Sequence, residues 1–392
     1  MAHLVWNRSE SAAVPLERLD RLLAPLGGME SVVRPGDTVL IKPNFVAPFP
    51  HAVTAFDILS AIINMVRNCG GKPIIGESSG FEFETETTFN ILGAYSFARR
   101  HKVPLINFDR TEFATVALGH GINQKVRIPR LVLEADRLIN VPKLKRHSLT
   151  KATVGVKNLF GLLSRKSRRK IHAWGLEKTI HALGERISCD LVVVDGSVVT
   201  TRAVFGEQTR LNLITASKSV HAVDVFCCQY LGLDYRDVEH IRRAVEMNPH
   251  RERFKVLEVL ENCRLPEAAI TFRSSDIPRW NDTAGKILHR RIYQLIYLID
   301  IVYSRMNGGR SMIPSIHYYF GIRPFIRRAQ CDACGKCAEV CPVNAIALPQ
   351  RRIIRDRCMP VRCLKCLYVC PLDAIGIKGR DVDPSLMQQN TV

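Results

Sequence analysis

The sequence lacks the motifs that most directly reveal nucleotide chemistry. It contains neither G-x-x-x-x-G-K-[ST] nor G-x-G-x-x-G, so neither a P-loop hydrolase nor a Rossmann dinucleotide enzyme is indicated. Basic residues are abundant, with 56 Lys and Arg against 37 Asp and Glu, but they are spread out. The one dense run, SRKSRRK at residues 164–170, has no interleaved aromatic residues, so no nucleic-acid partner is expected.

Long apolar runs are also absent. The most membrane-like stretch, residues 292–306, is shorter than the roughly 20 residues that a span requires, and it contains Asp300. We expect a helix packed on the core. The preceding KILHRR also suits a basic amphipathic helix on a membrane surface, and this peripheral contact is the lesser alternative. The first ten residues contain no long apolar segment, so no signal peptide is expected.

Cysteine is plentiful, but not in the pattern of a secreted disulfide scaffold. Eight of the 13 cysteines lie within residues 331–370, and the other five are scattered. One dense cluster among scattered single cysteines indicates metal binding in a reducing compartment, so a cytoplasmic protein is expected. The formal net charge of +19 allows anionic small molecules, acidic proteins and anionic lipid as partners.

The clustered cysteines form an internal repeat. The first copy, CDACGKCAEVCP at 331–342, is a C-x2-C-x2-C-x3-C-P run, the pattern of bacterial ferredoxins. Its last three cysteines recur 29 residues later, and CPVNAI becomes CPLDAI. The first cysteine has its counterpart at Cys358, two residues before the position that the repeat predicts. A two-residue insertion between the first two ligands of the second copy is the simplest explanation.

This spacing predicts two 4Fe–4S clusters. In two-cluster ferredoxins the cysteine before proline ligates the other cluster. The predicted ligands are therefore Cys331, Cys334, Cys337 and Cys370 for the first cluster, and Cys341, Cys358, Cys363 and Cys366 for the second. Zinc is disfavoured because the C-x3-C-P pattern occurs twice. If Cys358 cannot reach, the second site would hold a three-iron or labile cluster, although a loop of two extra residues is usually tolerated.

The remaining apolar segments alternate between runs of β-branched residues and runs with helical spacing. Strands are predicted at 38–41, 72–76, 103–108, 137–141, 190–196 and 211–217, and helices at 56–71, 87–101 and 220–232. This alternation predicts an α/β fold, with a mostly parallel sheet flanked by helices.

The chain is expected to contain two folded parts. The α/β domain covers residues 1–262, and a small α+β ferredoxin-like module covers 329–378. Residues 263–328, with a strand near 268–272 and a helix near 283–306, would connect them, and 379–392 form a polar tail.

Polar residues follow four of the predicted strands, as KPN, GESSG, PKLKRH and VVDG. Ligands of open α/β sheets bind at the carboxyl edge, so a shared cleft is predicted. The basic stretch 142–161 runs from a strand end towards a helix and suits a bound phosphate, carboxylate or oxyanion. A solvated basic face is the alternative, but Gly155, Gly161 and the apolar Leu159–Phe160 pair interrupt the pattern of an exposed helix.

The sequence resembles the domain-of-unknown-function family 362 in six ordered motifs: IKPN (41–44), GESSG (76–80), INVPKLKRH (139–147), GVKNLFG (155–161), VVDG (193–196) and AVD (222–224). The resemblance covers about residues 35–250 and the two-cluster module. It implies an iron–sulfur protein of the bacterial or archaeal cytoplasm, without one established reaction. The family's recurring positions correspond to Lys42, Asn44, Glu77, Ser78, Lys143, Lys145, His147, Lys157, Asn158, His172, Asp195 and Asp224.

Three segments depart from the family pattern. Arg146 stands where members usually have Thr, and TTRAVFGEQ (200–208) replaces a Gly-Pro turn. Lys218 and His221 lie where members often carry an acidic residue. These basic replacements suggest a divergent substrate at this end of the predicted cleft.

The predicted roles follow from charge and proton affinity. Lys143, Lys145 and Lys157 would hold negative charge, and His147 or Glu77 would supply protons. Glu77 could equally be a helix-cap partner in the GESSG turn, and His147 could be one more surface base. The surrounding anion-binding set is expected to be Lys42, Asn44, Ser78, Ser79, Asn158, His172, Asp195 and Asp224. Within it, Asp195 requires a lysine partner and Asp224 could simply cap or pair.

The leading hypothesis is an iron–sulfur oxidoreductase. It would take single electrons from a small donor such as ferredoxin or flavodoxin, and pass them through two clusters to an anionic substrate or an additional organic cofactor in the basic cleft. The alternatives are a non-catalytic electron-transfer subunit that docks on a larger redox enzyme, and an enzyme whose clusters are structural or sensory. The sequence indicates neither the substrate nor the oligomeric state.

Overall fold

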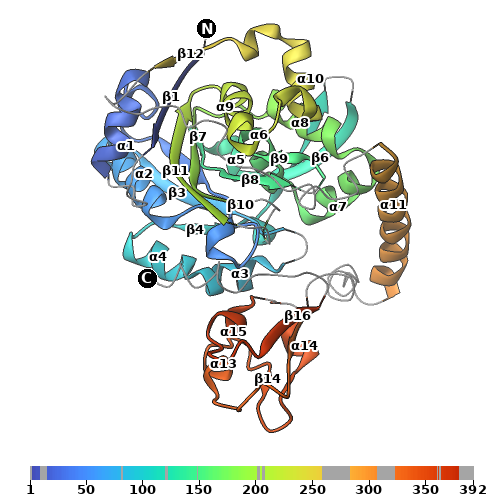
Figure 1. The fold of residues 1–392 in the computed structure, drawn as a ribbon. Helices are drawn as coiled ribbons and strands as arrows, with labels where there is room; N and C mark the ends of the chain where they lie inside the picture. The colour runs from blue at the N-terminus through green and yellow to red at the C-terminus, as the bar shows by residue number, and fades with distance from the viewer. Residues whose placement is uncertain are drawn as a thin grey trace.

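The α/β domain and the cysteine-rich module lie at opposite ends of the molecule in the computed structural model (Figure 1). The structure describes residues 2–8, 16–80, 83–119, 122–147, 149–200, 204, 208–257, 283–306, 323–359, 361 and 363–378. The strand expected near 268–272 and the polar tail lie outside these residues.

The α/β domain is built on one mixed sheet with the strand order β12-β1-β11-β10-β7-β2-β3-β4. The four pairings from β10 to β4 are parallel, whereas β11 pairs antiparallel with both β1 and β10. These strands are β1 (Ala2–Arg8), β2 (Thr38–Lys42), β3 (Lys72–Glu77), β4 (Leu105–Asn107), β7 (Arg137–Asn140), β10 (Leu191–Thr200), β11 (Gln208–Ser217) and β12 (Phe254–Leu257). The predicted fold class, a mostly parallel sheet flanked by helices, is confirmed.

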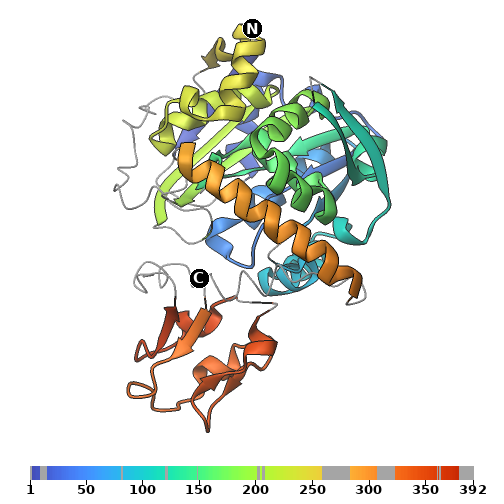
Figure 2. The same cartoon turned by 90° about the vertical axis from the view of Figure 1, so that its right-hand side faces the viewer.

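Helices cover both faces of the sheet (Figures 1 and 2). One face carries α1 (Leu16–Leu23), α2 (Phe56–Asn68), α3 (Thr85–Leu92) and α4 (Ala94–Arg100). The other carries α6 (Gly155–Leu159), α7 (Arg165–Trp174), α8 (Leu176–Arg186), α9 (Val220–Cys228) and α10 (Glu239–Met247). The single helix expected at 87–101 is divided into α3 and α4 because Gly93 adopts a left-handed conformation, with φ 75°.

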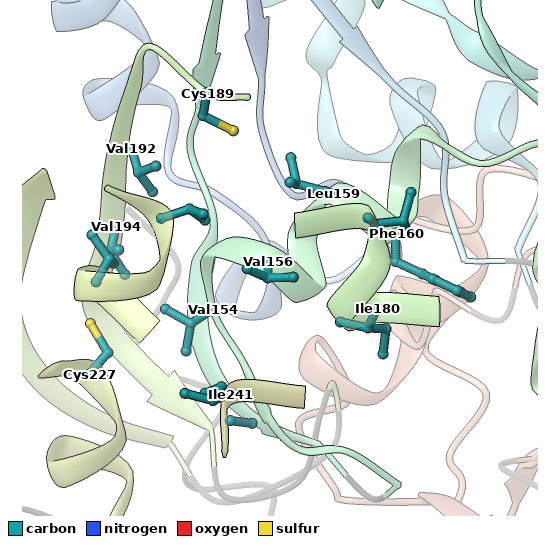
Figure 3. Close-up of a cluster of buried hydrophobic side chains, with 14 of the residues drawn as sticks. Val154, Val156, Leu159, Phe160, Ile180, Cys189, Val192, Val194, Cys227 and Ile241 are labelled. Carbon is teal, nitrogen blue, oxygen red and sulfur yellow. The ribbon is translucent and has the colours of Figure 1, made fainter. Parts of the chain in front are cut away.

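The alternation of side chains along β10 explains the two cores. Val192 and Val194 belong to the core under α6, α8 and α9, whereas Val193 points to the core under α1 and α2. Figure 3 shows the first of these cores, where Val156 and Leu159 of α6 lie between the sheet and Ile180 of α8. A strand buried on both faces needs a continuous apolar sequence, as LVVV provides.

The basic stretch after β7 differs from its prediction. We expected it to pass from a strand end into a helix, but residues 143–147 form a further strand, β8 (Lys143–His147). This strand pairs parallel to β10 and forms a hairpin with β9 (Lys151–Thr153) before α6 begins. Alternate residues of β8 therefore point inward, which buries Lys143 and Lys145. A second hairpin, β5 (Phe113–Gly119) with β6 (Ile122–Pro129), precedes the short helix α5 (Leu131–Glu134).

The cysteine-rich module is a twofold repeat in its backbone as well as its sequence. β13 (Arg323–Ile326) pairs with β16 (Ile375–Lys378), and β14 (Ile346–Ala347) pairs with β15 (Arg352–Ile353). The short helices are α13 (Lys336–Glu339), α14 (Arg355–Cys358) and α15 (Lys365–Tyr368). Because β13 pairs with β16, residues 323–326 belong to this module, where the sequence suggested a connector.

The long helix α11 (Thr283–Met306) forms where a helix near 283–306 was predicted. It packs on α7 along the outside of the α/β domain (Figure 2). Among the described residues, no helix is long and apolar enough to cross a membrane.

Candidate functional site: two cysteine cavities and a buried basic network

The eight clustered cysteines line two separate cavities. Cys331, Cys334, Cys337 and Cys370 surround the first, and Cys341, Cys358, Cys363 and Cys366 surround the second. In each set, three cysteines come from one copy of the repeat and the fourth comes from the other copy. This is the crossed arrangement that the ligand prediction requires. Their role as iron ligands remains a prediction.

The two cavities are built by matching backbone features. Gly335 and Leu364, 29 residues apart, are both left-handed, with φ 87° and 56°. Each precedes a short helix that carries a cysteine on its first turn. The amide of Ala345 donates to the Sγ of Cys341 at 3.1 Å, and that of Ala374 donates to Cys370 at 3.2 Å. Such N–H donors stabilise the negative charge that a cluster's thiolate ligands carry.

Cys358 reaches its cavity despite the longer spacing. It is the last residue of α14, and its amide donates to the carbonyl of Ile354 at 3.1 Å. Its carbonyl accepts from Val361, which closes a turn towards Cys363. Val361 itself lines the cavity beside Cys358 and Cys363.

Each cavity is surrounded by four cysteines and otherwise mostly by apolar residues. A cubane cluster spaces its four cysteines around a cage, whereas a tetrahedral ion draws them together. The donor set, four cysteines around each apolar-lined cavity, thus fits 4Fe–4S clusters.

The polar residues of the α/β domain meet where β2 adjoins β7. The chain moves outward from β2 through β3 to β4 and then returns to β7 on the other side of β2, so this is a switch point in the strand order. Lys42 and Asn140, the last residues of β2 and β7, are register partners. Glu77, the last residue of β3, forms a buried ion pair with Lys42.

The side chain of Lys145 joins this switch point to the loop after β2. Its Nζ donates to Oδ1 of Asn44 at 3.0 Å and to the carbonyl of Ala52 at 2.7 Å. Asn44 in turn donates to Asn158, which donates to Asn140, both at 2.8 Å. Burial and the neighbouring cation Lys143 hold the pKa of Lys145 well below its usual range.

Lys143 forms a separate ion pair. Its Nζ lies 2.9 Å from Oδ2 of Asp195 and 3.1 Å from the hydroxyl of Ser197. The same carboxylate accepts from the amides of Ala55 and Ser197. The pair is fully buried, so it holds the loop after β2 onto β10 and leaves neither charge for a ligand.

Ser78 and Ser79 are held by a residue that the sequence analysis did not single out. Arg168 is buried, donates to the Ser79 carbonyl at 2.6 Å and to the Ser78 hydroxyl at 3.0 Å, and lies 3.6 Å from Asp109. It belongs to the run SRKSRRK, which resembles a solvated face. The helical spacing of Ser164, Arg168 and Ile171, all buried, was the available signal.

Residues 76–80 also match the G-x-S-x-G spacing of hydrolase nucleophile elbows. The Ser78 hydroxyl, however, donates to the carbonyl of Gly161 at 2.8 Å and accepts from Arg168. No histidine contacts it among the described residues, so the arrangement does not support an activated serine.

Gly161 lies where any side chain would collide with the Lys42–Glu77 pair. A Cβ at this position would lie 2.6 Å from Oε1 of Glu77 and 2.9 Å from Nζ of Lys42. Burial lowers the pKa of Lys42 and raises that of Glu77, and the charge of each partner opposes the shift of the other.

Asp224 acts as a helix cap. Its carboxylate accepts from the amides of Gly155 and Val156, at 2.6 and 3.1 Å, at the start of α6. Burial raises its pKa to about 6. It therefore holds the start of α6, the helix that carries Lys157 and Asn158.

Three residues of the predicted set remain partly accessible: Lys157, His147 and His172. The Nζ of Lys157 lies 4.4 Å from the centroid of the Phe160 ring, and the ring of His172 meets the same phenyl edge-on at 5.6 Å. Both Lys157 and His172 lower the pKa of His147 through their charge, so the three lie within electrostatic reach of one another.

Lys157 differs from the other lysines of the predicted set. Within the described part of the chain it makes no hydrogen bond and no ion pair, whereas Lys42, Lys143 and Lys145 are fully partnered. Burial lowers its pKa to about 8, partly offset by Glu177. It is thus a cation at neutral pH that is partly desolvated and has no carboxylate at ion-pair distance among the described residues.

His147 is oriented by its own turn. Its Nδ1 accepts from the amides of Leu149 and Thr150, at 3.1 and 3.3 Å. Desolvation holds its pKa well below 6.5, so the ring is neutral at pH 7 with its proton on Nε2. It can therefore donate a hydrogen bond to an anion without carrying charge.

Comparisons with known proteins agree with this picture. The profile "Domain of unknown function (DUF362)" matches residues 39–229, and a "4Fe-4S binding domain" profile matches residues 324–347. The thylakoid-associated protein sll1697 of Synechocystis sp. is 32% identical over 245 residues, which cover 59% of this chain and 74% of that protein. The chain belongs to the DUF362 family. The resemblance noted in the sequence is thereby confirmed, and this DUF362 protein binds a 4Fe–4S cluster in its C-terminal module.

Two solved structures resemble the DUF362 protein distantly. The lactate racemase apoprotein of Thermoanaerobacterium thermosaccharolyticum has a TM-score of 0.40 and 14% identity, over 56% of this chain and 55% of that one. A Thermotoga maritima protein has a TM-score of 0.35 and 14% identity, over 62% and 60% of the two chains. The matches span less than two thirds of either structure, and no function is taken from them.

Proposed function

We propose that this protein is an oxidoreductase in which two 4Fe–4S clusters supply single electrons to an anionic substrate or cofactor bound beside α6. The presence of an iron–sulfur electron-transfer module is established by its family match. The number of clusters, the eight cysteine ligands and the acceptor are parts of the proposal. The two four-cysteine cavities support the cluster number.

The observation that carries the proposal is the unpaired Lys157. Among the described residues, no carboxylate lies at ion-pair distance from this partly buried cation. Such a cation favours an anionic ligand, because an electrostatic attraction is stronger where water has been removed. His147, with its proton on Nε2, and the imidazole of His172 lie within electrostatic reach and would complete the binding surface. The residues of the switch point would position this surface and would not themselves touch the ligand.

The loop after β2 would couple the two parts of the protein. Phe49 and Ala52 of this loop share one apolar cluster with Leu364, Cys366 and Leu367 of the module. The opposite side of the loop is held by Lys145 and Asp195. This supports transfer within one chain, from the module to the carboxyl edge of the sheet.

The external donor would be a small redox protein such as a ferredoxin or flavodoxin. Cys334 at the first cavity is exposed, and so is its neighbour Leu372. An exposed cluster edge is suited to electron exchange with a transient partner. The free, scattered cysteines of the described residues support a reducing compartment, the cytoplasm.

The test is ligand binding by the cluster-loaded protein, purified without oxygen. We expect a panel of small carboxylates and phosphates, screened by calorimetry, to contain a ligand whose affinity falls at least tenfold in Lys157→Ala, since a charge-assisted hydrogen bond contributes about 1.5–3 kcal/mol. Lys170→Ala, an exposed lysine on α7, is the matched control. Equal affinities in the wild type and Lys157→Ala would refute the site.

The affinity should also depend on pH in one direction. Lys157 is protonated below its pKa of about 8, so binding of an anion should weaken as the pH rises through about 8. Lys157→Arg keeps the charge to much higher pH and should move the loss of affinity upward. A pH profile identical in the two proteins would assign the charge to another group.

A non-catalytic electron-transfer subunit is the second candidate, favoured by the exposed edge at Cys334. It predicts binding to a partner protein that weakens strongly with salt, together with no small-molecule affinity.

A further inference from the structure

Helix α11 carries a continuous apolar stripe on its outward face. Leu288, Ile292, Leu295, Ile299, Val302 and Met306 recur every three or four residues and are 40–80% exposed. Leu298 and Tyr303, also exposed, widen the stripe to roughly 140° of the helix at 100° per residue. The helix has 24 residues and is therefore about 36 Å long. A contiguous apolar surface of this size normally marks an interaction site.

The opposite face of α11 fixes the direction of the stripe. Asp300 is buried there and forms a 2.9 Å ion pair with Arg169 of α7. A helix anchored by a buried ion pair cannot rotate to hide its apolar side without leaving a charge unpaired. The stripe is thus held away from the α/β domain, along the outer surface seen in Figure 2.

The charges around the stripe are almost all positive. On α11 itself, Arg291 and Arg305 are exposed at one edge of the stripe, and Asp300, the single acidic residue in the sequence of this helix, is already paired. The neighbouring helix α7 adds the exposed Lys166 and Lys170. Two copies of such a helix would face each other with like charges, without the opposite charges that flank the seam of a coiled coil. Anionic headgroups, in contrast, would match a basic rim around an apolar stripe.

We propose that α11 docks the protein on an anionic lipid bilayer, with the stripe in the headgroup–acyl boundary and the basic rim against lipid phosphates. The helix would lie in the plane of the membrane surface and would not cross it. This inference is independent of the proposed redox function, because it uses a different face of the α/β domain.

The test is sedimentation of the full-length, cluster-loaded protein with vesicles. One set contains phosphatidylglycerol and phosphatidylcholine at about 3:7, and the other contains phosphatidylcholine alone. We expect at least tenfold tighter binding to the anionic vesicles, weakened by salt. The double variant Leu295→Glu/Val302→Glu should lose this binding. Met247→Glu, an equally exposed apolar residue on α10, is the matched control and should keep it.

Other outcomes would overturn the proposal. Equal binding to both vesicle sets, or undiminished binding by the double variant, would show that α11 is not the contact.

Light scattering without lipid provides a second measurement. A wild-type protein that is dimeric, together with a double variant that is monomeric, would mean that a second copy covers the stripe. No binding by the wild-type monomer would mean that another part of the chain covers it. Circular dichroism and cluster absorbance verify that the variants are folded.

Discussion

Cys358 lies two residues out of register with its counterpart Cys331, and yet it faces the same cavity as Cys341, Cys363 and Cys366. Both residues end an i to i−4 hydrogen bond, from Cys331 to Arg327 and from Cys358 to Ile354. The local backbone of the ligand is therefore preserved, and the chain absorbs the insertion after it.

The first prediction concerns this residue. We expect about eight iron atoms per wild-type chain, as two 4Fe–4S clusters require. Cys358→Ser should lower this number and change the spectrum of one cluster, since serine replaces a thiolate ligand. Iron analysis and electron paramagnetic resonance of the reduced protein measure the effect. Cys69→Ser, outside the module, is the control. About four iron atoms in the wild type would show that the second cavity holds no complete cluster.

At the scale of elements, the loop between β2 and α2 connects the two parts of the molecule. On its inner side, the carbonyl of Ala52 accepts from Lys145. On its outer side, Phe49 is buried and meets Phe83 edge-on at 5.9 Å. Lys145 thus stabilises the conformation of this loop. The charge pattern of the sequence alone does not suggest this structural role.

The second prediction tests this structural role. Lys145→Met keeps the apolar stem but leaves the Ala52 carbonyl and the Asn44 side chain without their donor, at a cost of about 1–3 kcal/mol for each unsatisfied group. We expect faster amide exchange at residues 43–55, measured by hydrogen–deuterium exchange. Lys151→Met, on the adjacent strand β9, should leave this loop unchanged. Unchanged exchange in Lys145→Met would mean that the loop is held by other contacts.

The elements also show what the sequence could and could not reveal. The parallel strands ending at Lys42 and Glu77 follow from short β-branched runs with polar ends, and the structure places them within two residues of the predictions. The strand β8 did not follow, because KLKRH has the composition of a loop or helix. This segment is a strand because it pairs with β10, whose residues lie about fifty positions further along the chain.

The same distinction applies to the candidate site. The motif order predicts that Lys42, Asn44, Lys145 and Asn158 lie together, since the carboxyl ends of neighbouring parallel strands meet. Hydrogen bonds link Asn44 to both Lys145 and Asn158, and their role in binding stays a prediction. Which lysine lacks a partner could not be predicted, because that depends on side-chain hydrogen bonds. Lys157 looks like its neighbours in the sequence and differs only in its surroundings.

At the scale of the whole molecule, buried titratable groups set the response to acid. Burial lowers the pKa of His51 and of His221 to about 4, and raises that of Asp224 to about 6. Between about pH 6.5 and 4 these two histidines are therefore protonated in the unfolded chain and neutral in the folded chain, and His147 acts in the same direction. Asp224 has the opposite sign, since its folded form binds a proton more tightly and gains stability as the pH falls from about 6 to 4.

The third prediction is a net loss of stability on acidification. From pH 7 to pH 5, each histidine costs about 2 kcal/mol and Asp224 returns about 1 kcal/mol, a net loss of about 3 kcal/mol. Thermal unfolding at the two pH values measures the difference. His51→Gln should reduce it by about 2 kcal/mol, the share of one histidine, and the exposed His250→Gln should not change it. A difference that is the same in all three proteins would contradict the assignment to His51.

The pairing of β13 with β16 has one further consequence. The first and last strands of the cysteine module are adjacent, with Arg323 opposite Lys378, so the chain enters and leaves the module at one point. A unit whose ends coincide can be gained, lost or transplanted during evolution without straining its host. The separate profiles that match residues 39–229 and 324–347 correspond to the host and to this unit.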